Sequence, residues 1–558
     1  MSYAALILLK KNSMHVISFF ILLCSSICAA TDSFKEYFQQ GTHFFYQKKF
    51  NSALEYYEKA HELNPHNAQT LFNIGIVLKT QKKWELAIEY FNSAIEQKKD
   101  YAKAYFYAAE SYRHLNNHNK ALAFYQQTIK YAPEWFDAYK EAALLYRESS
   151  NYKEAITCLN SAYTVLIKKN PSITQLIDLA HHLITLGQTE QTITLYNHIL
   201  KIDPNNPQIL YNKAYTLKIA GKLDEAITLY QRVLELEPDY EHAHFGLAMS
   251  YITNGNFDAG WPYYDEYLRR VHNTAERLRN FLRKKTIKGK KILLQYQGGL
   301  GDSIQFIRYA QILKEMDATV LVYIQKQLIP LFSNCPYIDQ LIPSGSAYPE
   351  RNAHASLMSL PCIFRSTQQT LPNNVPYLFP DQQLVKYWKK KIKDDTNFKI
   401  GICWQVNMHN DSSRYPIARR GIPLEHFYAL AKQPGITLYS LQRHDGQKDL
   451  DNLPDDVHII SFDDLDTENG AFMDTAALMQ HLDVVICPDT AIAHLAGALG
   501  IPVYVLLPYQ SDWRWLSGKS YSPWYPSMRV FKQEKPFEWK SVFKRVFQRI
   551  SHIIHDPL

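Results

Sequence analysis

The residues best suited to chemistry lie between two short apolar runs near the C-terminus. Residues 483–487 and 503–507 have the pattern of buried parallel strands, and one short helix fits between them. Asp489 or Thr490 can cap its first turn, and Gly500 can end it. Open α/β sheets bind ligands at such a corner, and the first helix amides suit a phosphate. An ordinary capped helix explains the same residues, so both interpretations stay open.

A second polar corner follows the predicted strand 292–296. Gly299 and Gly301 precede Asp302 and an amphipathic helix over residues 303–314, without the third glycine of the dinucleotide fingerprint. Asp302 also stands where a pyrophosphate needs positive potential, so an NAD site is disfavoured. We expect the glycines to let an acceptor approach the backbone, with Asp302 facing a cleft as a base. The alternative is that Asp302 only caps the helix.

Three arginines form a further candidate group. Arg414, Arg419 and Arg420 lie in a loop after the predicted strand 398–403, which ends next to Trp404. A guanidinium matches phosphate oxygens in a fork, so this loop suits a diphosphate leaving group. We expect Arg420 and Trp404 to lie at this diphosphate site, with Arg414 as a secondary candidate. Surface arginines without a function are the alternative.

Aromatic residues gather beyond the last core strand. Trp513 and Arg514 lie in one stretch, and a second aromatic stretch covers residues 522–526. Sugar and base rings stack on such side chains. Trp513 and Arg514 are therefore secondary site candidates, although a packed C-terminal loop would look the same.

The chain changes character at residue 291, after which strands and helices alternate. The remaining predicted strands cover residues 319–324, 338–342, 436–441, 457–461 and 528–531. Alternation predicts parallel sheets with right-handed crossovers. We expect two Rossmann-like lobes, the first over residues 291–390 and the second over residues 391–558.

The preceding region, residues 31–267, repeats itself. Pro204 and Pro238 are one period of 34 residues apart, and Pro65 and Pro133 two periods. Small residues recur at fixed offsets in two sets, one in each helix of a repeat, and aromatics follow the second set by four residues. Small residues at these positions let the two helices of a pair cross closely. This is the tetratricopeptide (TPR) pattern, and it predicts an α-solenoid whose concave face binds a protein or peptide. A rigid spacer or a dimerising arm is the alternative.

Composition excludes several other classes. A net charge of +7 on 558 residues is too mild to indicate nucleic-acid binding. The seven cysteines show no CxxC spacing, so we expect neither a metal site nor a disulfide framework, and no cofactor. Residues 268–290 are strongly basic and read as a solvated linker.

Residues 1–30 resemble a signal peptide, with an apolar run that is short for a membrane span. Signal peptide, uncleaved anchor and a later start at Met14 stay open, and membrane association through this segment is possible. Nucleotide sugars are expected in the cytoplasm, which favours a cytoplasmic or cytoplasmic-face, membrane-tethered protein. A cleaved leader would instead imply export.

Several stretches together resemble a known family. They are Tyr296-Gln297-Gly298-Gly299-Leu300-Gly301-Asp302, Gly401-Ile402-Cys403-Trp404, Ser440-Leu441-Gln442, Asp474-Thr475-Ala476-Ala477-Leu478, Pro488-Asp489-Thr490-Ala491-Ile492-Ala493-His494-Leu495-Ala496 and Asp512-Trp513-Arg514-Trp515. From residue 34 onward the chain resembles bacterial TPR-containing glycosyltransferase-like proteins. Their C-terminal half is similar to the heptosyltransferases, glycosyltransferase family 9.

The resemblance implies a GT-B fold, with the acceptor on the first lobe, a nucleotide-sugar on the second, and inverting transfer without a metal. Asp302 matches the family's acid, and Asp489, Thr490 and His494 match its donor-phosphate motif. Gln297 departs from the family turn, and the basic loop around Arg414 is not matched residue for residue.

Two other functions fit the same sequence. The solenoid could feed acceptor peptides into the cleft, as in protein O-glycosyltransferases that resemble O-GlcNAc transferase in plan. The GT-B half could instead be inactive, which would make the protein a TPR adaptor. The sequence does not name the sugar, the nucleotide or the acceptor.

Overall fold

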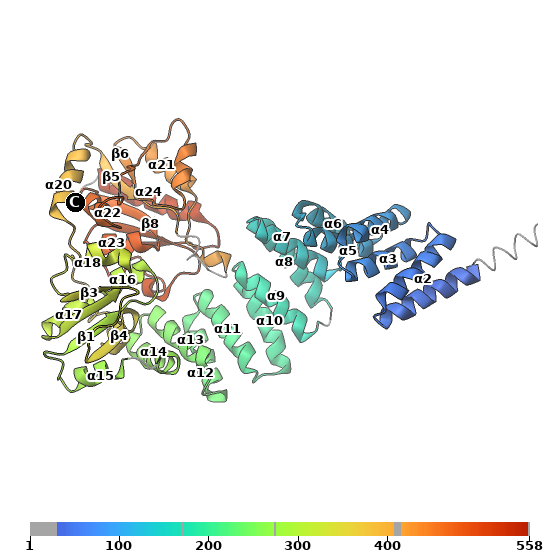
Figure 1. The fold of residues 1–558 in the computed structure, drawn as a ribbon, viewed down its shortest axis with the longest axis horizontal. Coiled ribbons are helices and arrows are strands. Elements are labelled where there is room, and N and C mark those ends of the chain that lie inside the picture. The colour runs from blue at the N-terminus through green and yellow to red at the C-terminus, as the bar shows by residue number, and fades with distance from the viewer. Residues whose placement is uncertain (1–30, 170, 273–274, 407–414, 556–558) are drawn as a thin grey trace, which may run out of the picture. The chain divides into compact units, whose positions relative to one another are not determined.

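The computed structural model describes residues 31–169, 171–272, 275–406 and 415–555 (Figure 1). The leader expected at residues 1–30 and the candidate Arg414 lie outside this range. The chain divides into two compact units, residues 1–175 and 176–558. Within the described ranges, no helix combines the length and the apolarity needed to cross a membrane.

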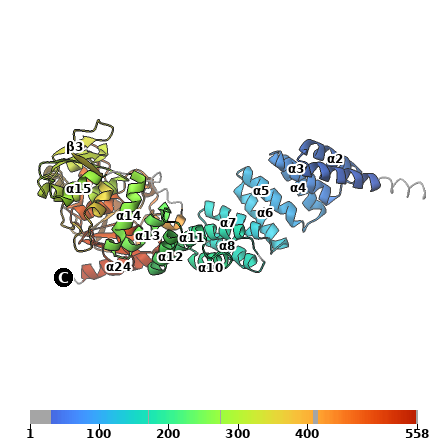
Figure 2. The ribbon, with the colours of Figure 1, turned by 90° about the horizontal axis from the view of Figure 1, so that it is seen from below.

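The first unit consists of antiparallel helix pairs (Figure 2). After a helical stretch at residues 31–46, its helices are α2 (Phe50–Leu63), α3 (Ala68–Thr80), α4 (Trp84–Gln97), α5 (Ala102–His114), α6 (His118–Tyr131), α7 (Phe136–Glu148) and α8 (Tyr152–Ile167). The period-34 glycines explain the close crossings. A Cβ on Gly75 would lie 2.6 Å from the ring of Phe91, and one on Gly41 would lie 2.7 Å from Tyr57. The small-residue and aromatic offsets are thus partners in packing.

The second unit begins with further helices of the same kind. They are α9 (Ile173–Thr185), α10 (Thr189–Ile202), α11 (Pro207–Ile219), α12 (Leu223–Leu236), α13 (Glu241–Thr253) and α14 (Phe257–His272), followed by α15 (Glu276–Arg283). The same contact between a glycine and an aromatic ring recurs here, with the aromatic residue before the glycine in the sequence. A Cβ on Gly246 would lie 2.6 Å from the ring of Tyr230. The predicted TPR solenoid is confirmed.

The first sheet contains four parallel strands in the order β3-β2-β1-β4. They are β1 (Lys291–Gln295), β2 (Thr319–Ile324), β3 (Gln340–Pro343) and β4 (Ala353–Ser356), and the last was not predicted. The predicted helix over 303–314 is two helices, α16 (Leu300–Phe306) and α17 (Tyr309–Glu315). The short elements η1 (Lys326–Leu328), α18 (Ile329–Phe332), η2 (Leu357–Ser359) and α19 (Leu360–Ile363) complete this lobe.

The second sheet contains six parallel strands in the order β10-β9-β8-β5-β6-β7. They are β5 (Phe398–Ile402), β6 (Ile436–Ser440), β7 (Ile459–Ile460), β8 (Val484–Pro488), β9 (Val503–Leu507) and β10 (Met528–Lys532). Its helical elements are η3 (Pro416–Ala418), η4 (Leu424–Phe427), α21 (Tyr428–Ala431), η5 (Gln447–Asn452), α22 (Met473–Met479), α23 (Ala491–Ala498), η6 (Trp513–Trp515) and α24 (Trp539–His555). Strand order places β8, with α23 after it, next to the central β5. The expected α-solenoid followed by a GT-B-like pair of α/β lobes is confirmed.

The helix that connects the two lobes packs on the second one. Helix α20 (Gln382–Lys391) lies almost wholly before the boundary predicted at residue 390, yet it packs on α22 of the second lobe. Trp388 of α20 is fully buried there, and its Nε1 donates to Asp474 Oδ1 at 2.9 Å. The predicted domain limits themselves stay predictions.

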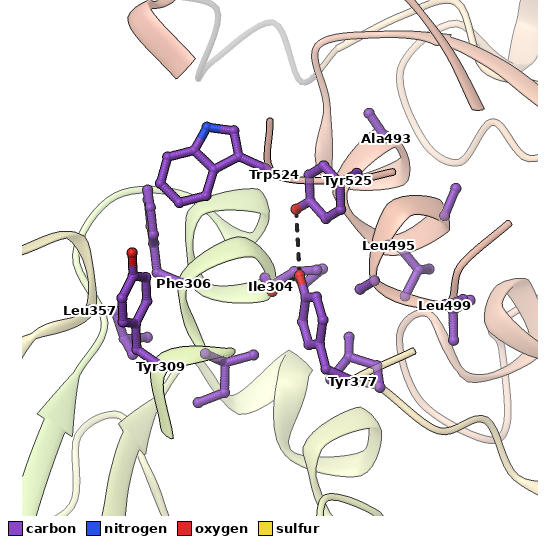
Figure 3. Close-up of a cluster of buried hydrophobic side chains, with 14 of the residues drawn as sticks. Ile304, Phe306, Tyr309, Leu357, Tyr377, Ala493, Leu495, Leu499, Trp524 and Tyr525 are labelled. Carbon is purple, nitrogen blue, oxygen red and sulfur yellow. Dashed lines mark hydrogen bonds between the residues drawn. The ribbon is translucent and has the colours of Figure 1, made fainter. Parts of the chain in front are cut away.

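The two lobes meet through one buried layer, in which α16 packs on α23 (Figure 3). The hydroxyls of Tyr377 and Tyr525 hydrogen-bond across it at 3.4 Å. Arg308, only 1% exposed, lies between these two rings, 4.5 and 4.4 Å from their centroids. Its guanidinium donates to the carbonyls of Gln305, Pro372 and Trp524 and to the Tyr377 hydroxyl. A buried cation therefore joins both lobes and the connection between them.

The last repeat helices pack against the same two lobes. Helix α13 contacts η6, and the Ser517 N–H donates to the Thr253 carbonyl at 2.8 Å. Trp261 of α14 donates from Nε1 to the Ser366 carbonyl at 2.6 Å. The last repeat helices of this unit therefore pack directly against the α/β lobes, and a linker is not their only connection to them.

Candidate functional site

One cavity of about 320 Å³ lies between the carboxyl ends of the two sheets. Its walls come from the β1–α16 corner, the β8–α23 corner and the segments after β5 and β6. Among the lining residues are Gly299, Gly301, Asp302, Gln405, Arg420, Gln442, Asp466, Asp489, Thr490, His494 and Arg514. Both polar corners expected from the sequence therefore open into one space.

In the first corner, Asp302 uses both carboxylate oxygens. Oδ2 accepts the backbone N–H of Gly299 at 2.8 Å, which closes the first turn of α16. Oδ1 accepts from Nη2 of Arg514 at 2.9 Å, across the boundary between the lobes. The capping alternative is thus part of the structure, but it does not exclude the cleft-facing one, because each oxygen keeps a second lone pair.

Arg514 is the central charge of the cavity. It is 7% exposed, and its Nε lies 3.1 Å from Oδ1 of Asp512. Burial lowers the pKa of Arg514, but the carboxylates of Asp512, Asp302 and Asp489 outweigh burial and raise it. The guanidinium therefore stays charged and joins an acid of each lobe.

In the second corner, the amino end of α23 is open. Thr490 is the N-cap residue but accepts no N–H with its side chain, and its Oγ1 is buried without a hydrogen-bond partner among the described residues. Beside it, Nη1 of Arg420 donates to the Asp489 carbonyl at 3.0 Å. The first amides of a helix have no carbonyl acceptor within it, so hydroxyl, amides and guanidinium together suit an anion.

Asp489 and His494 form the wall behind this corner. Burial is the main reason that the pKa of Asp489 is raised, although Arg514 opposes it. Burial, and then the charges of Arg514, Arg308 and Arg420, hold the pKa of His494 well below its usual value. His494 is therefore neutral, with Nδ1 2.9 Å from the Tyr525 hydroxyl and Nε2 3.8 Å from Asp489.

The two corners approach each other at Gly301. A Cβ on this residue would lie 3.0 Å from Cδ2 of His494 and 3.3 Å from Cα of Ala491. The absence of a side chain lets the first turns of α16 and α23 approach each other closely. Gly301 thus positions the lobes in addition to lining the cavity.

Most of the predicted site residues line this cavity, but two aromatics do not. Trp404 is fully buried behind the wall, and its Nε1 donates to Asp449 at 2.8 Å. Trp513 packs between the rings of Phe306 and Trp524, away from the lining. Both therefore support the wall, and Arg414 falls outside the described residues.

Gln442 was quoted only as part of the family pattern, and the structure gives it a role. Its Oε1 accepts the N–H groups of Trp404 and Gln405 at 3.0 and 2.9 Å, and its Nε2 donates to the Asp445 carbonyl at 2.7 Å. It therefore fixes the turns after β5 and β6 that form one cavity wall. A buried amide with several partners has no sequence signal of its own.

Asp466 was missed entirely. It accepts the N–H groups of Asp474 and Thr475 at 2.8 and 3.0 Å and so caps α22 from eight residues upstream. Burial raises the pKa of its carboxyl despite these bonds. Within the ranges that the structure covers, no group of three or more His, Cys, Asp or Glu side chains is arranged to hold a metal ion.

The fold defines a TPR protein with a GT-B-like α/β half. Sequence comparison agrees: tetratricopeptide repeat families match residues 36–100, 103–134, 195–228 and 215–255. Glycosyltransferase family 9 (heptosyltransferase) matches residues 471–536, which include α22, α23 and η6. The chain is therefore similar to TPR repeats before residue 256 and to glycosyltransferase family 9 over residues 471–536.

One curated relative is the protein FlbA of Caulobacter vibrioides, 24% identical over 391 residues. The match covers 65% of this chain and 64% of the relative, so the chain spans somewhat less than two thirds of that protein's length.

Solved structures of similar repeat proteins cover parts of the chain. YrrB, described as a TPR protein with an unusual peptide-binding site, is 18% identical, with 34% of this chain and 95% of YrrB covered at a TM-score of 0.28. A tetratricopeptide repeat protein from Parabacteroides merdae is also 18% identical, with coverage of 43% and 94% at a TM-score of 0.29.

Proposed function

We propose that the protein is a glycosyltransferase that moves a sugar from a nucleotide-sugar to a hydroxyl group. The observation that supports this most directly is that Asp302 and the open end of α23 line one cavity from opposite lobes. The family 9 match over residues 471–536 supports the same reaction class. The diphosphate would bind at Thr490 and Arg420, and the acceptor beside Gly299 and Gly301.

The proposed chemistry is a single displacement, which inverts the anomeric carbon. The acceptor oxygen attacks that carbon and its proton passes to Asp302, while the bond from carbon to the diphosphate oxygen breaks. The first amides of α23, the Thr490 hydroxyl and the Arg420 guanidinium stabilise the charge that develops on the leaving diphosphate. Arg514 neutralises Asp302 before the reaction and faces the same cavity. In this scheme protein groups supply the positive potential, and no cofactor takes part.

A polypeptide acceptor is the variant of this function that one observation favours. Helices α11 and α13 of the repeats contact residues 509–517, the segment that contains Arg514. TPR arrays commonly hold peptides, so an acceptor bound on these helices would be delivered close to the cavity. We therefore propose a protein or peptide partner for the repeats and place the reaction where nucleotide sugars are found, in the cytoplasm or on the cytoplasmic side of a membrane.

The test is isothermal titration of the full chain with UDP-, GDP-, ADP-, dTDP- and CMP-linked sugars. We expect one nucleotide class to bind and its affinity to fall in Arg420→Met. Mass spectrometry of co-purified or added proteins then shows whether a sugar is attached to polypeptide. Absence of binding to every donor would reject the enzyme and favour the adaptor function.

A further inference from the structure

The turn that joins the two helices of a repeat has the same backbone conformation along the array, with one residue at a positive φ. In the first unit, where φ lies between +58° and +61°, these residues are Lys48, Lys82, Asn116 and Ser150. In the second unit, where φ lies between +74° and +83°, they are Gly187, Gly221 and Gly255. Because L residues adopt this turn in the first unit, its backbone alone does not require glycine.

The three glycines differ in the space around them. A Cβ on Gly187 would lie 2.6 Å from Cγ of Pro536 in the second lobe, whereas one on Gly221 would meet no described atom within 4 Å. A Cβ on Gly255 would lie 2.5 Å from Nε2 of Gln368, the end of a flexible side chain that can move aside. The proline ring cannot move in this way. At Gly187 the bare backbone is therefore needed for the close approach of the repeats to the second lobe.

The same turn, between α9 and α10, also meets the short element η3 of the second lobe. A Cβ on Gly187 would lie 3.4 Å from Cγ2 of Ile417. Ile417 is 1% exposed and forms a buried cluster with Ile184 of α9 and Ile219 of α11. Its carbonyl also accepts the Gln510 N–H at 3.0 Å. Repeat helices therefore supply much of the apolar surface that encloses η3.

The residue before η3 packs on one of these helices. The ring of Tyr415 lies 6.1 Å from that of Tyr215 on α11, measured between centroids. The Tyr215 hydroxyl in turn accepts a hydrogen bond from Nε2 of Gln510 at 3.2 Å. The start of η3 and its partner Gln510 are therefore held on the same repeat helix.

Arg420 lies between two fixed points of the backbone. Before it in the chain, Ile417 is enclosed by the repeats. After it, the Ile422 N–H donates to the Trp404 carbonyl at 2.8 Å. Between them, Nη1 of Arg420 donates to the Asp489 carbonyl at 3.0 Å, beside the open end of α23. The backbone that carries this guanidinium thus takes its position from the repeats on one side and from the cavity wall on the other.

We infer that the α9–α10 turn positions the proposed diphosphate site: Ile184 holds Ile417, and the bare backbone of Gly187 lets it come close enough to do so. If the turn moved away from η3, the fixed point before Arg420 would be lost, and its guanidinium would no longer be held beside α23. Ile184 is not among the residues that line the described cavity, so it is a positioning residue that acts through Arg420. The inference deepens the proposed function, and its effect on binding rests on that function.

The test compares Gly187→Ala with Gly221→Ala. Both place an L residue at the same turn position, at a φ of +74° and +77°, so they carry similar backbone strain, but only the first also collides with the second lobe. Hydrogen exchange of the full chain, followed by mass spectrometry, reports on the amides of residues 417–422. We expect roughly tenfold faster exchange there in Gly187→Ala than in Gly221→Ala. Ile184→Ala should reproduce the effect if Gly187→Ala folds poorly. Equal exchange in the variants and the wild type would overturn the inference.

A second measurement tests whether the turn acts through Arg420. Titration with UDP, GDP, ADP and dTDP should show binding about threefold to tenfold weaker in Gly187→Ala than in Gly221→Ala. In an Arg420→Met background, Gly187→Ala should weaken binding no further, because the group that the turn positions is already gone. An equal further loss in that background would contradict the inference, since the turn would then act only on general stability.

The two measurements also separate this inference from the proposed function. If the wild type binds none of these diphosphates, the proposed function fails, whereas the exchange result still decides whether the repeats position η3. Binding that is equal in Gly187→Ala and Gly221→Ala, despite faster exchange in the first, would contradict the link from the turn to the cavity.

Discussion

The β1–α16 and β8–α23 corners both consist of a strand end followed by a helix start. They differ in whether a side chain closes that helix start. At the first, the N-terminal turn of α16 is already closed by the carboxylate of Asp302 on the Gly299 N–H. At the second, the N-cap Thr490 leaves the amide end of α23 open. A helix start that contains its own anion repels another, and one without it attracts a phosphate. For this reason we propose that the diphosphate binds at the second corner and that the acid of the first corner accepts the proton.

The largest effect should come from removing the acid alone. Asp302→Asn keeps an oxygen that accepts the Gly299 N–H, so the helix start stays closed while the base is lost. We expect turnover of the donor identified by titration to fall roughly 10²- to 10⁴-fold, the usual contribution of a general base. Nucleoside diphosphate binding, measured by titration, should persist. Loss of both properties together, or of neither, would remove Asp302 from this role.

The next effect tests the open corner. Arg420→Met should weaken diphosphate binding by about 1.5 to 3 kcal/mol, the range for hydrogen bonds to charged groups. Arg419→Met is the matched control, since Arg419 is exposed and does not line the cavity. Equal weakening in both variants would show that general positive charge, and not this corner, attracts the diphosphate.

A third variant tests the contact between the corners. Gly301→Ala places a Cβ 3.0 Å from His494 and should destabilise the second unit by about 1 to 3 kcal/mol through overpacking. Gly299→Ala is the control, because its Cβ would meet only Asp302 Oδ2, at 3.7 Å, and its φ is −83°. Thermal melts compare the two, and an equal loss would mean that the corners do not pack as described.

The smallest effect concerns pH. The pKa of His494 is held well below 6.5 in the folded protein, so below that pH the unfolded chain binds a proton that the folded chain does not. Stability is then fully present above the unfolded pKa of about 6.5 and falls as pH drops through it, by at most about 1.4 kcal/mol per unit. His494→Gln should flatten the loss between pH 7.5 and 5.5 in melts of both proteins. A parallel decline would show that His494 is protonated when folded.

Sequence patterns predicted the two corners because local rules govern them. Small residues, caps and strand ends place Gly301, Asp302 and Thr490 without reference to the rest of the chain. Arg514 was only a secondary candidate, since its ion pair with Asp302 joins positions 212 residues apart. No local pattern encodes such a pair, and only the packing of the two lobes creates it.

Two aromatic residues were predicted to belong to the site but do not line the cavity. Trp404 and Trp513 are residues of the kind on which ligand rings stack. Trp404 is instead buried within its own lobe, and Trp513 packs on Phe306 of the first lobe and on Trp524. The fit of the last repeats to the second lobe could not be predicted from the sequence either, because Tyr215 looks like an ordinary repeat position. Its partner Gln510 lies in a loop 295 residues later.

The buried guanidinium of Arg308 also bears on how the proposed donor would enter. Wide separation of the lobes would pull this cation from the Trp524 carbonyl and the Tyr525 ring of the second lobe, at a cost of several kcal/mol for a buried charge. The proposed substrates would therefore enter through a gap whose width is nearly constant. In the enzyme that we propose, the distance between the lobes would stay nearly constant. Loops at the rim of the cavity would move instead of the connection between the lobes.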